Sequence, residues 1–383
     1  MELYSLTAPC HFGLEAVLKK EIYDMGYDIT RVDDGRVTFE GDAEAIARAN
    51  IFSRSAERIL IECASFKAES FEELYDKTRA LDWSRFIPQN GKFWITKASS
   101  VKSKLHSPSD IQSIMKKAMV DSLKESYHTG SLLEDGAEYP FRVFIKKDMV
   151  TIGLDTTGES LHKRGYRKLT AKAPIAENLA AALISLTPWN KDRVLADPFC
   201  GSGTFPIEAA LMAANIAPGM KRRFRAQTWD NLMDKKLWKD VFEEAKDLVD
   251  LSCHPDITGT DIDPSMIDIA KQNAKLAGVD KLITFRQCDV AQFSHPASYG
   301  FMITNPPYGE RLMGEEDVRP LYDSLRKTFN SLDKWSLYVI TSYEGTQTAL
   351  KKKAAKNRKL YNGMIKTYFY MFPGERPAKD RSE

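Results

Sequence analysis

The chain has 383 residues, of which 43% are hydrophobic and 28% are charged, as in an ordinary globular protein of two or three domains. Its 55 basic and 53 acidic side chains leave a net charge of +2, so only local clusters can indicate a nucleic-acid partner. Five scattered cysteines without a CxxC pair argue against a disulfide framework or a zinc site. We therefore expect no metal. Because no signal peptide or long apolar run is found, we also expect a cytoplasmic protein without a membrane partner.

The first 158 residues alternate short strand and helix patterns, which predicts small α+β modules. Residues 2–8 and 36–41 are typical of strands, and 13–26 predicts a helix that ends at Gly26. Residues 92–127 predict a strand, a Ser/Lys-rich loop and a helix capped by Ser109 or Asp110. Two more strands should follow, joined by a Lys-Lys-Asp turn.

The pattern changes beyond residue 164. Four short apolar runs, at 194–199, 257–262, 283–290 and 301–307, each lead into an acidic or amide residue, and helical stretches separate the first three. Strands that alternate with helices predict a doubly wound, mainly parallel α/β sheet. Sheets of this kind bind ligands at the carboxyl ends of their strands. We therefore expect a ligand site along that edge. Residues 377–383 are expected to form a flexible tail.

A glycine loop follows the first of these runs. A strand should end at Asp197, and a helix should begin near Thr204. Gly201 and Gly203 allow a ligand to approach the backbone, and the helix start favours a negative group. The loop lacks the GK[ST] ending of a Walker motif, and an ordinary strand-to-helix turn is the plain alternative.

Two carboxylates follow the next two runs. Asp261 is placed to accept both hydroxyls of a ribose, and Asp289 to accept from an adenine amino group. A dinucleotide fold has its ribose carboxylate ~20 residues beyond the glycines, whereas an insertion here makes the separation from Gly203 much longer. The spacing therefore disfavours an NAD site. Asp263 is expected only to cap a helix whose first residue is Pro264.

The fourth run ends in Asn305-Pro306-Pro307-Tyr308. The exocyclic amine of a nucleobase is a poor nucleophile, because its lone pair is delocalised into the ring. The Asn305 side-chain oxygen and the Pro306 carbonyl could accept its two hydrogens, and prolines hold such a loop rigid. The Tyr308 ring offers a face on which a splayed base can stack. This pattern favours amino methylation over an incidental turn.

In this order, the four motifs resemble S-adenosylmethionine-dependent amino-methyltransferases of the Rossmann-like class. Residues 161–183 resemble the segment that opens the catalytic domain of THUMP-domain RNA guanine-N2 methyltransferases, 96–119 resembles the THUMP core, and 8–22 resembles the family's ferredoxin-like element. The similarity is greatest to members that act on bacterial 23S ribosomal RNA and carry a single methyltransferase domain. Transfer RNA enzymes share this architecture.

The resemblance implies four regions and a set of site residues. The regions are a ferredoxin-like element (1–55), a THUMP RNA-binding domain (56–158), a methyltransferase domain (159–376) and the tail. Catalytic residues would be Asn305, Pro306, Pro307 and Tyr308. The cofactor S-adenosylmethionine would be held by Ala173, Pro174, Asp197, Phe199, Cys200, Gly201, Ser202, Gly203, Thr204, Asp261, Ile262, Asp289, Val290 and Asn305.

Basic residues gather in three clusters that could hold RNA. They lie in the THUMP-like part, in the insertion after the glycine loop, and near the C-terminus at 351–359. Because the net charge is only +2, three basic clusters imply compensating acidic residues elsewhere in the chain, and a surface polarised in this way suits phosphate binding. The RNA-binding candidates are Lys97, Lys102, Lys104, Lys116, Lys117, Arg222 and Arg223. We expect a chain that starts near Leu161 to keep cofactor affinity and to lose most of its RNA affinity.

There are three alternatives to an RNA methyltransferase, and the first two share the chemistry of this site. DNA adenine or cytosine methyltransferases need a target-recognition region, and protein-glutamine methyltransferases carry a helical N-terminal module, which the mixed N-terminal half disfavours. A non-catalytic RNA-binding protein would need a broken site, and all four motifs look intact. The sequence implies RNA as partner, 23S ribosomal or transfer RNA, and implies no oligomeric state.

Overall fold

A computed structural model describes residues 2–167, 175–307 and 315–377. They form two compact units that exchange short segments of chain. The first unit contains residues up to 10, 19–161 and 223–244, and the second contains 11–18, 162–222 and 245 onward. No described helix has the length and apolar character needed to span a membrane.

The first unit is built on a seven-stranded sheet of order β2-β3-β1-β4-β7-β6-β5. Its strands are β1 (Tyr4–Pro9), β2 (Ile29–Asp33), β3 (Arg36–Gly41), β4 (Leu60–Lys67), β5 (Lys92–Val101), β6 (Glu138–Lys146) and β7 (Met149–Asp155). Its helices are α1 (Glu15–Asp24), α2 (Ala43–Phe52), α3 (Phe71–Arg79) and α4 (Pro108–Ser126), and most of α7 (Lys235–Asp247) belongs to it.

One face of this sheet is apolar. Leu6, Ile61, Phe141 and Leu154 are buried and lie on the same face by strand register. Along each strand, the residues next to these four are mostly polar, because successive side chains of a strand point to opposite faces of the sheet. The sheet therefore has an apolar face, packed by helices such as α4, and a polar face.

Ser107 caps α4 through its hydroxyl, with Pro108 at the first helical position. This corrects the expected cap at Ser109 or Asp110. The residue before a proline is biased towards extended backbone, and this favours Ser107 as the last non-helical residue.

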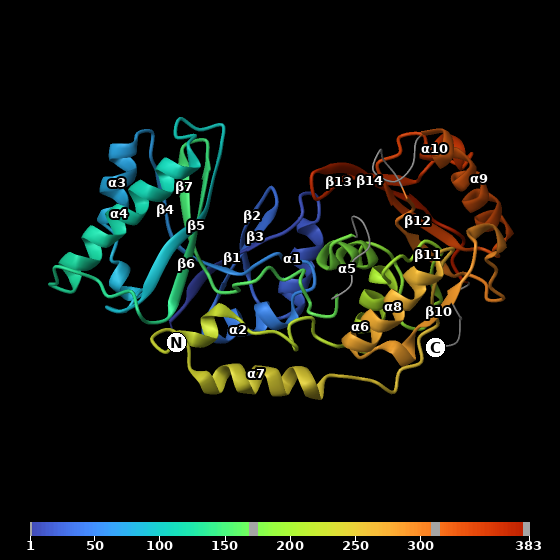
Figure 1. Cartoon of the computed structure of the whole chain (residues 1–383), viewed down its shortest axis with the longest axis horizontal. Coiled ribbons are helices and arrows are strands. Elements are labelled where there is room, and N and C mark those ends of the chain that lie inside the picture. Colours follow the sequence, from blue (N-terminus) through green and yellow to red (C-terminus); the bar gives the residue numbers. More distant parts are fainter. Residues whose placement is uncertain (1, 168–174, 308–314, 378–383) are drawn as a thin grey trace. The chain divides into compact units, whose positions relative to one another are not determined.

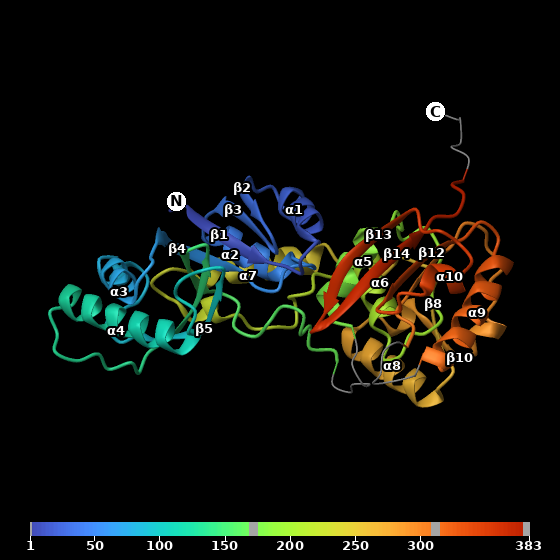
Figure 2. The ribbon, with the colours of Figure 1, turned by 90° about the horizontal axis from the view of Figure 1, so that it is seen from above.

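The second unit is a doubly wound sheet of order β10-β9-β8-β11-β12-β14-β13. Its strands are β8 (Leu195–Asp197), β9 (Ile257–Asp261), β10 (Thr284–Gln287), β11 (Phe301–Thr304), β12 (Ser336–Thr341), β13 (Lys356–Asn362) and β14 (Ile365–Phe372). Its helices are α5 (Glu177–Ser185), α6 (Thr204–Ala213), α8 (Pro264–Ala277), α9 (Glu315–Ser331) and α10 (Thr346–Ala349). Strands β8 to β12 pair in parallel, and β14 pairs antiparallel with both β12 and β13. Figure 2 shows β13 and β14 (red) side by side.

Helices cover both faces of this parallel sheet. Leu195 and Ile303 pack in one apolar cluster with α5, α6 and α8, while Ala196 and Met302 pack in another with α9 (Figure 1). Strands buried on both faces read as unbroken apolar runs, which is why these strands could be recognised in the sequence. The strand order reverses between β8 and β11, the point at which doubly wound sheets bind ligands.

The insertion after α6 returns to the first unit. Trp229 is fully buried, stacks on Tyr139 with ring centroids 5.2 Å apart, and donates to the Glu138 carbonyl at 2.8 Å. Asn231 accepts from the Tyr139 hydroxyl at 2.6 Å and donates to the Phe86 carbonyl at 3.0 Å. Residues 223–244 are thus a structural part of the N-terminal unit, although the sequence places them between strands of the second unit.

Candidate active site

Four side chains predicted to form the site lie at one edge of the doubly wound sheet. Asp197 ends β8, Asp261 ends β9, Asp289 follows β10, and Asn305 follows β11. These strands are neighbours in the order β10-β9-β8-β11 and run parallel. Their carboxyl ends therefore meet on the same side, which brings together residues that are more than 100 positions apart in the sequence.

Asp197 is almost completely buried at the reversal point, with 2% of its surface exposed. Its Oδ1 accepts hydrogen bonds from the Thr304 hydroxyl at 2.5 Å and from the Phe199 amide at 3.1 Å. Burial raises the pKa of Asp197 to about 7, and these two hydrogen bonds oppose the rise. The carboxylate would gain most from a cationic ligand group, since opposite charge stabilises its ionised form.

The glycine loop is fixed to the neighbouring strand. The Cys200 amide donates to the Thr260 carbonyl at 2.9 Å, and the Gly201 amide donates to Asp261 Oδ2 at 2.9 Å. Asp261 Oδ1 accepts from the Asp263 amide at 3.0 Å. Asp261 therefore has a structural role in addition to the predicted contact with a ribose.

Positive φ angles explain both glycines of the loop. Gly201 has φ of +48° and Gly203 has φ of +85°, in the region that residues with side chains disfavour. A Cβ atom on Gly203 would also lie 3.0 Å from the Ala270 Cβ and 3.1 Å from the Phe285 ring. Gly203 precedes α6 without a side-chain cap, so the first amides of that helix stay available at the site.

Three residues that support the loop and strand ends were missed by sequence reasoning. Asn273, fully buried on α8, donates to the Ser202 carbonyl at 3.1 Å. Arg167 donates to the Thr204 hydroxyl at 2.7 Å, and Thr304 binds Asp197 as described. Thr304 and Asn273 are polar residues at positions where the pattern of the strand or helix is apolar. This was the signal in the sequence that could have identified them as supporting residues.

The region around β10 is more open. Asp289 caps the short turn that follows it, accepting from the Ala291 amide at 2.8 Å. Val290 is buried, whereas Ile262 exposes 65% of its surface. An exposed apolar side chain beside two carboxylates suits one face of a heterocyclic base.

Asn305 lies directly beyond β11 and is partly buried. Its side-chain oxygen is buried, and among the described residues it has no hydrogen-bond partner. Buried amide oxygens are nearly always satisfied, so this atom is suited to a donor supplied by a ligand. Pro306 is buried and Pro307 partly buried beside it. Tyr308, Ala173 and Pro174 lie outside the described residues, so their predicted roles remain predictions.

The basic residues predicted to bind RNA fall into two groups. Lys116 lies with Nζ 3.3 Å from the Phe93 ring centroid and 2.7 Å from Glu134, and Lys104 forms an ion pair with Glu69. These two are held by contacts within their own domain, which weakens their case as RNA contacts. The side chains of the second group are exposed in Lys97, Lys102, Lys117 and Arg223 and partly exposed in Arg222.

Comparison with known families accounts for nearly the whole chain. Residues 164–370 match the RMKL-like methyltransferase domain, 5–60 match the RlmL ferredoxin-like domain, and 68–155 match the THUMP domain. The chain belongs to the THUMP-containing RNA methyltransferases.

Relatives of this methyltransferase support the assignment along its full length. It is 46% identical over 386 residues to "Putative RNA methyltransferase YpsC" of Bacillus subtilis, with all of both chains covered. It is 34% identical over 370 residues to ribosomal RNA large subunit methyltransferase K/L of Shewanella baltica, covering 94% of this chain and 52% of that protein. The chain thus spans about half the length of that second relative.

A solved structure supports the cofactor. The crystal structure of SMU.472, complexed with SAH, is 41% identical and superposes with a TM-score of 0.93, covering 98% of this chain and all of that one. This methyltransferase depends on S-adenosylmethionine. The buried Asp197 carboxylate, the uncapped start of α6 and the unpartnered Asn305 oxygen are features that fit such a ligand.

Proposed function

We propose that this methyltransferase modifies the exocyclic N2 amine of a guanine in RNA, with 23S ribosomal RNA as the substrate. The observation that carries the proposal is the buried, unpartnered side-chain oxygen of Asn305 at the end of β11. An acceptor in that position can hold an N–H of an exocyclic amine, a donor that the exocyclic carbonyl oxygens and the ring carbons of a base do not offer. The THUMP match favours RNA as the substrate, and the name of the Shewanella relative favours ribosomal RNA.

The chain's residues would act mainly by positioning. Asp197 and the glycine loop hold the methionine end of the cofactor, Asp261 the ribose and Asp289 the adenine. S-adenosylmethionine, when bound, supplies an electrophilic methyl group on a sulfonium. Asn305 Oδ1 and the Pro306 carbonyl accept the two amine hydrogens and direct the nitrogen lone pair. The amine gains a methyl group and afterwards loses a proton to solvent, so no side chain is needed as a strong base. Fixing two reactants in this way can supply a large part of the rate enhancement.

Nucleoside mass spectrometry tests the substrate. Ribosomal and transfer RNA from a strain lacking the gene are separated, digested and compared with those of the parent. We expect N2-methylguanosine to fall in the 23S fraction and to return when the wild-type chain is supplied, but not when the Asn305→Ala chain is supplied. A loss confined to transfer RNA would transfer the activity to that substrate. A loss of a different methylated base, with N2-methylguanosine intact, would refute the guanine assignment.

A further inference from the structure

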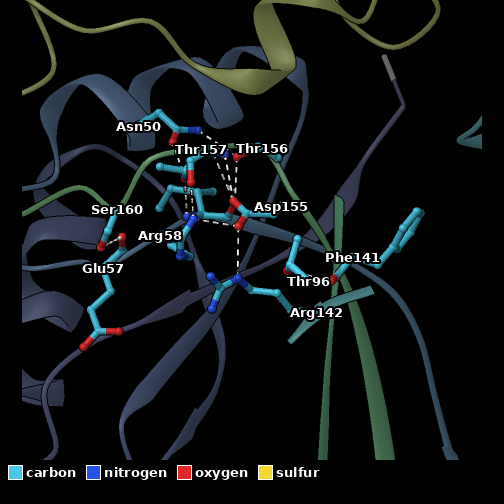
Figure 3. A network of polar contacts seen from close by, with 12 residues as sticks. Asn50, Glu57, Arg58, Thr96, Phe141, Arg142, Asp155, Thr156, Thr157 and Ser160 are labelled. Atoms are coloured by element: carbon cyan, nitrogen blue, oxygen red, sulfur yellow. Dashed lines mark hydrogen bonds and ion pairs between the residues drawn. The ribbon is translucent and has the colours of Figure 1, made fainter. Parts of the chain in front are cut away.

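Some polar groups of the chain are satisfied by their neighbours and act within the fold. In the N-terminal unit, Asp155 accepts hydrogen bonds from Arg58 at 2.7 Å and from Arg142 Nε at 3.0 Å, and Figure 3 shows both arginines directed at its carboxylate. A carboxylate held in this way offers little to a ligand. The carboxyl edge of the doubly wound sheet differs, because the buried Asn305 oxygen there has no partner among the residues that the structure describes. The groups that border Asn305 are therefore candidates for contact with the substrate.

Strand β12 borders Asn305 on the side away from the cofactor residues. In the sheet order β10-β9-β8-β11-β12, the three carboxylates proposed to hold the cofactor lie at the ends of β8, β9 and β10, on the other side of β11. Thr304 pairs in parallel register with Val339, and neighbouring strands lie about 4.8 Å apart. The last residue of β12, Thr341, therefore reaches the same edge as Asn305. In an in-line transfer the amine approaches the methyl group opposite to the sulfur, so the accepting base would lie on the β12 side of the site.

The turn that follows β12 is held by Thr341, which is fully buried. Its hydroxyl oxygen accepts a hydrogen bond from the Tyr322 hydroxyl on α9 at 2.8 Å and another from the Tyr343 amide at 3.0 Å. The rings of Tyr322 and Tyr343 are in contact, with centroids 5.1 Å apart and planes tilted by 56°. Both the backbone and the ring of Tyr343 are therefore fixed by neighbours in the same unit.

The Tyr343 ring occupies space that Gly345 leaves open. A Cβ atom on Gly345 would lie 2.5 Å from both Cζ and Oη of Tyr343, much closer than atoms in contact can approach. Gly345 has φ of −72°, which any residue can adopt, so the nearby ring and not the backbone accounts for the glycine. Tyr343 is partly buried, and its hydroxyl forms no hydrogen bond with any described residue. Buried tyrosine hydroxyls usually have a partner, and a bound base could supply it.

We propose that Tyr343 determines the specificity for guanine, by donating a hydrogen bond from its hydroxyl to O6 of the target base. The inference rests on the proposed function, N2 methylation of a guanine. The Watson–Crick edge of guanine presents the N2 amine, the N1–H group and the O6 carbonyl in a row. When Asn305 and Pro306 hold the amine, O6 is the acceptor at the other end of that edge, and Tyr343 is a donor beyond the neighbouring strand.

The same contact would discriminate against adenine. Adenine has its amine at one end of this edge and a C–H group at the other, so it would leave the Tyr343 hydroxyl unpaired. Sites that form a hydrogen bond with one group of the substrate reject analogues that lack this group.

The test compares two bases in one RNA. A fragment of 23S ribosomal RNA that spans the methylated guanine, identified by the mass spectrometry described above, is prepared with guanine or with 2-aminopurine at that position. 2-Aminopurine keeps the N2 amine and lacks O6. Full-length wild type, Tyr343→Phe and the control Tyr23→Phe, at a position that is 50% exposed on α1, are compared by kcat/KM. We expect Tyr343→Phe to be about tenfold slower on guanine, the effect of losing one hydrogen bond, and unchanged on 2-aminopurine. The control should match the wild type on both, and all three chains should bind SAH equally.

Gly345→Ala provides a second variant that keeps the hydroxyl and displaces the ring. We expect it to lower kcat/KM on guanine about as much as Tyr343→Phe, and to have little further effect when combined with Tyr343→Phe. A full additional loss in the double variant would show that Gly345 acts independently of Tyr343.

The outcomes separate the two proposals. Wild-type rates in Tyr343→Phe, or equal losses on both bases, would overturn the specificity assignment and leave N2 methylation intact. A wild-type chain that binds SAH but methylates no guanine N2 in 23S ribosomal RNA from the strain lacking the gene would overturn the proposed function, on which the role of Tyr343 depends.

Discussion

At the residue scale, Asn305 should distinguish catalysis from cofactor binding. We expect Asn305→Ala to lower the rate of methyl transfer by about 10²–10³, the usual effect of removing one preorganised hydrogen-bonding group. Affinity for SAH should stay close to that of the wild type, because the carboxylates of the other strand ends are retained. Single-turnover kinetics and calorimetry measure the two quantities. The exposed Asn357, on β13, provides the control substitution Asn357→Ala. Equal losses of affinity and rate would place Asn305 in cofactor binding alone.

Asp261 should show a graded effect, because its two oxygens hold two backbone amides. Asp261→Ala removes both acceptors and the charged contact to the ribose, and we expect SAH to bind more weakly by about 1.5–3 kcal/mol. Asp261→Asn keeps one acceptor for the Gly201 amide and should lose less. Calorimetry gives both values. If the Asn variant bound SAH as weakly as the Ala variant, the charge rather than the loop contact would determine affinity.

Asp197 predicts a pH dependence of stability. Burial raises its pKa from 3.8 to about 7, so the folded state favours the protonated form. This group's contribution to folding is fully present below about pH 4 and is lost as the pH rises to about 7. Asp197→Asn cannot ionise, and its free energy of unfolding relative to the wild type should therefore increase between pH 4 and pH 8. Urea titrations at several pH values measure the difference. Parallel pH profiles for the two proteins would contradict the raised pKa.

The same residue predicts a pH dependence of binding. A cationic methionine end favours ionised Asp197, so a proton should be released when SAH binds below about pH 7. Affinity should rise from pH 6 to pH 8 in the wild type and stay flat in Asp197→Asn. Calorimetry in buffers of different ionisation enthalpy counts the proton directly. Binding without proton release at pH 6 would show that Asp197 does not face the cationic group.

At the element scale, the segment 223–244 should be needed for the stability of the N-terminal unit. Trp229 is fully buried against Tyr139, and large-to-small substitutions of buried aromatic residues cost about 3–5 kcal/mol. We expect Trp229→Ala to lower the free energy of unfolding by that amount in urea titrations. Tyr23→Ala, at a position that is 50% exposed, should have little effect. A change below about 1 kcal/mol in the Trp229 variant would show that the segment is not integral to the unit.

Elements with strong local signals could be predicted from the sequence. The strands β8, β9 and β11 are short apolar runs because both their faces are buried, and the start of α8 follows from the Asp263 cap and Pro264. Strand β2 was missed because its residues are exposed or partly exposed, so it has no apolar pattern. The packing of 223–244 was also missed. Its buried tryptophans are consistent with any core, and only tertiary structure decides which unit they join.

The candidate site shows the same division. Its four strand-end residues could be placed together, because parallel strands align their carboxyl ends. The second role of Asp261 and the support from Asn273 depend on side-chain contacts between distant segments. Such contacts leave no periodic signature in a single sequence.

At the scale of the whole molecule, the exchanged segments change what a truncation should do. Leu14 and Val17 pack in the core of the methyltransferase unit, and 223–244 belongs to the other unit. A fragment starting at Leu161 would lack the first contacts and uncover Trp229 and other buried aromatic residues. We therefore expect it to aggregate and to fail to bind SAH, contrary to the expectation from sequence. Gel filtration and calorimetry test this. A monodisperse fragment with full affinity would restore the simpler picture of separable modules.

The exchange also sets an order of events during synthesis. Chains emerge from the ribosome N-terminus first, and domains generally fold as units at about 5–20 residues per second. Here the N-terminal sheet is finished at Asp155, but the tryptophan that covers Tyr139 is made only after β8 and α6. The nascent sheet must therefore wait roughly 4–16 s at these rates for residues 223–244. Over the same period residues 11–18 must remain free for a partner core that is not yet complete. Translation speed across the glycine loop should consequently influence the yield of folded protein.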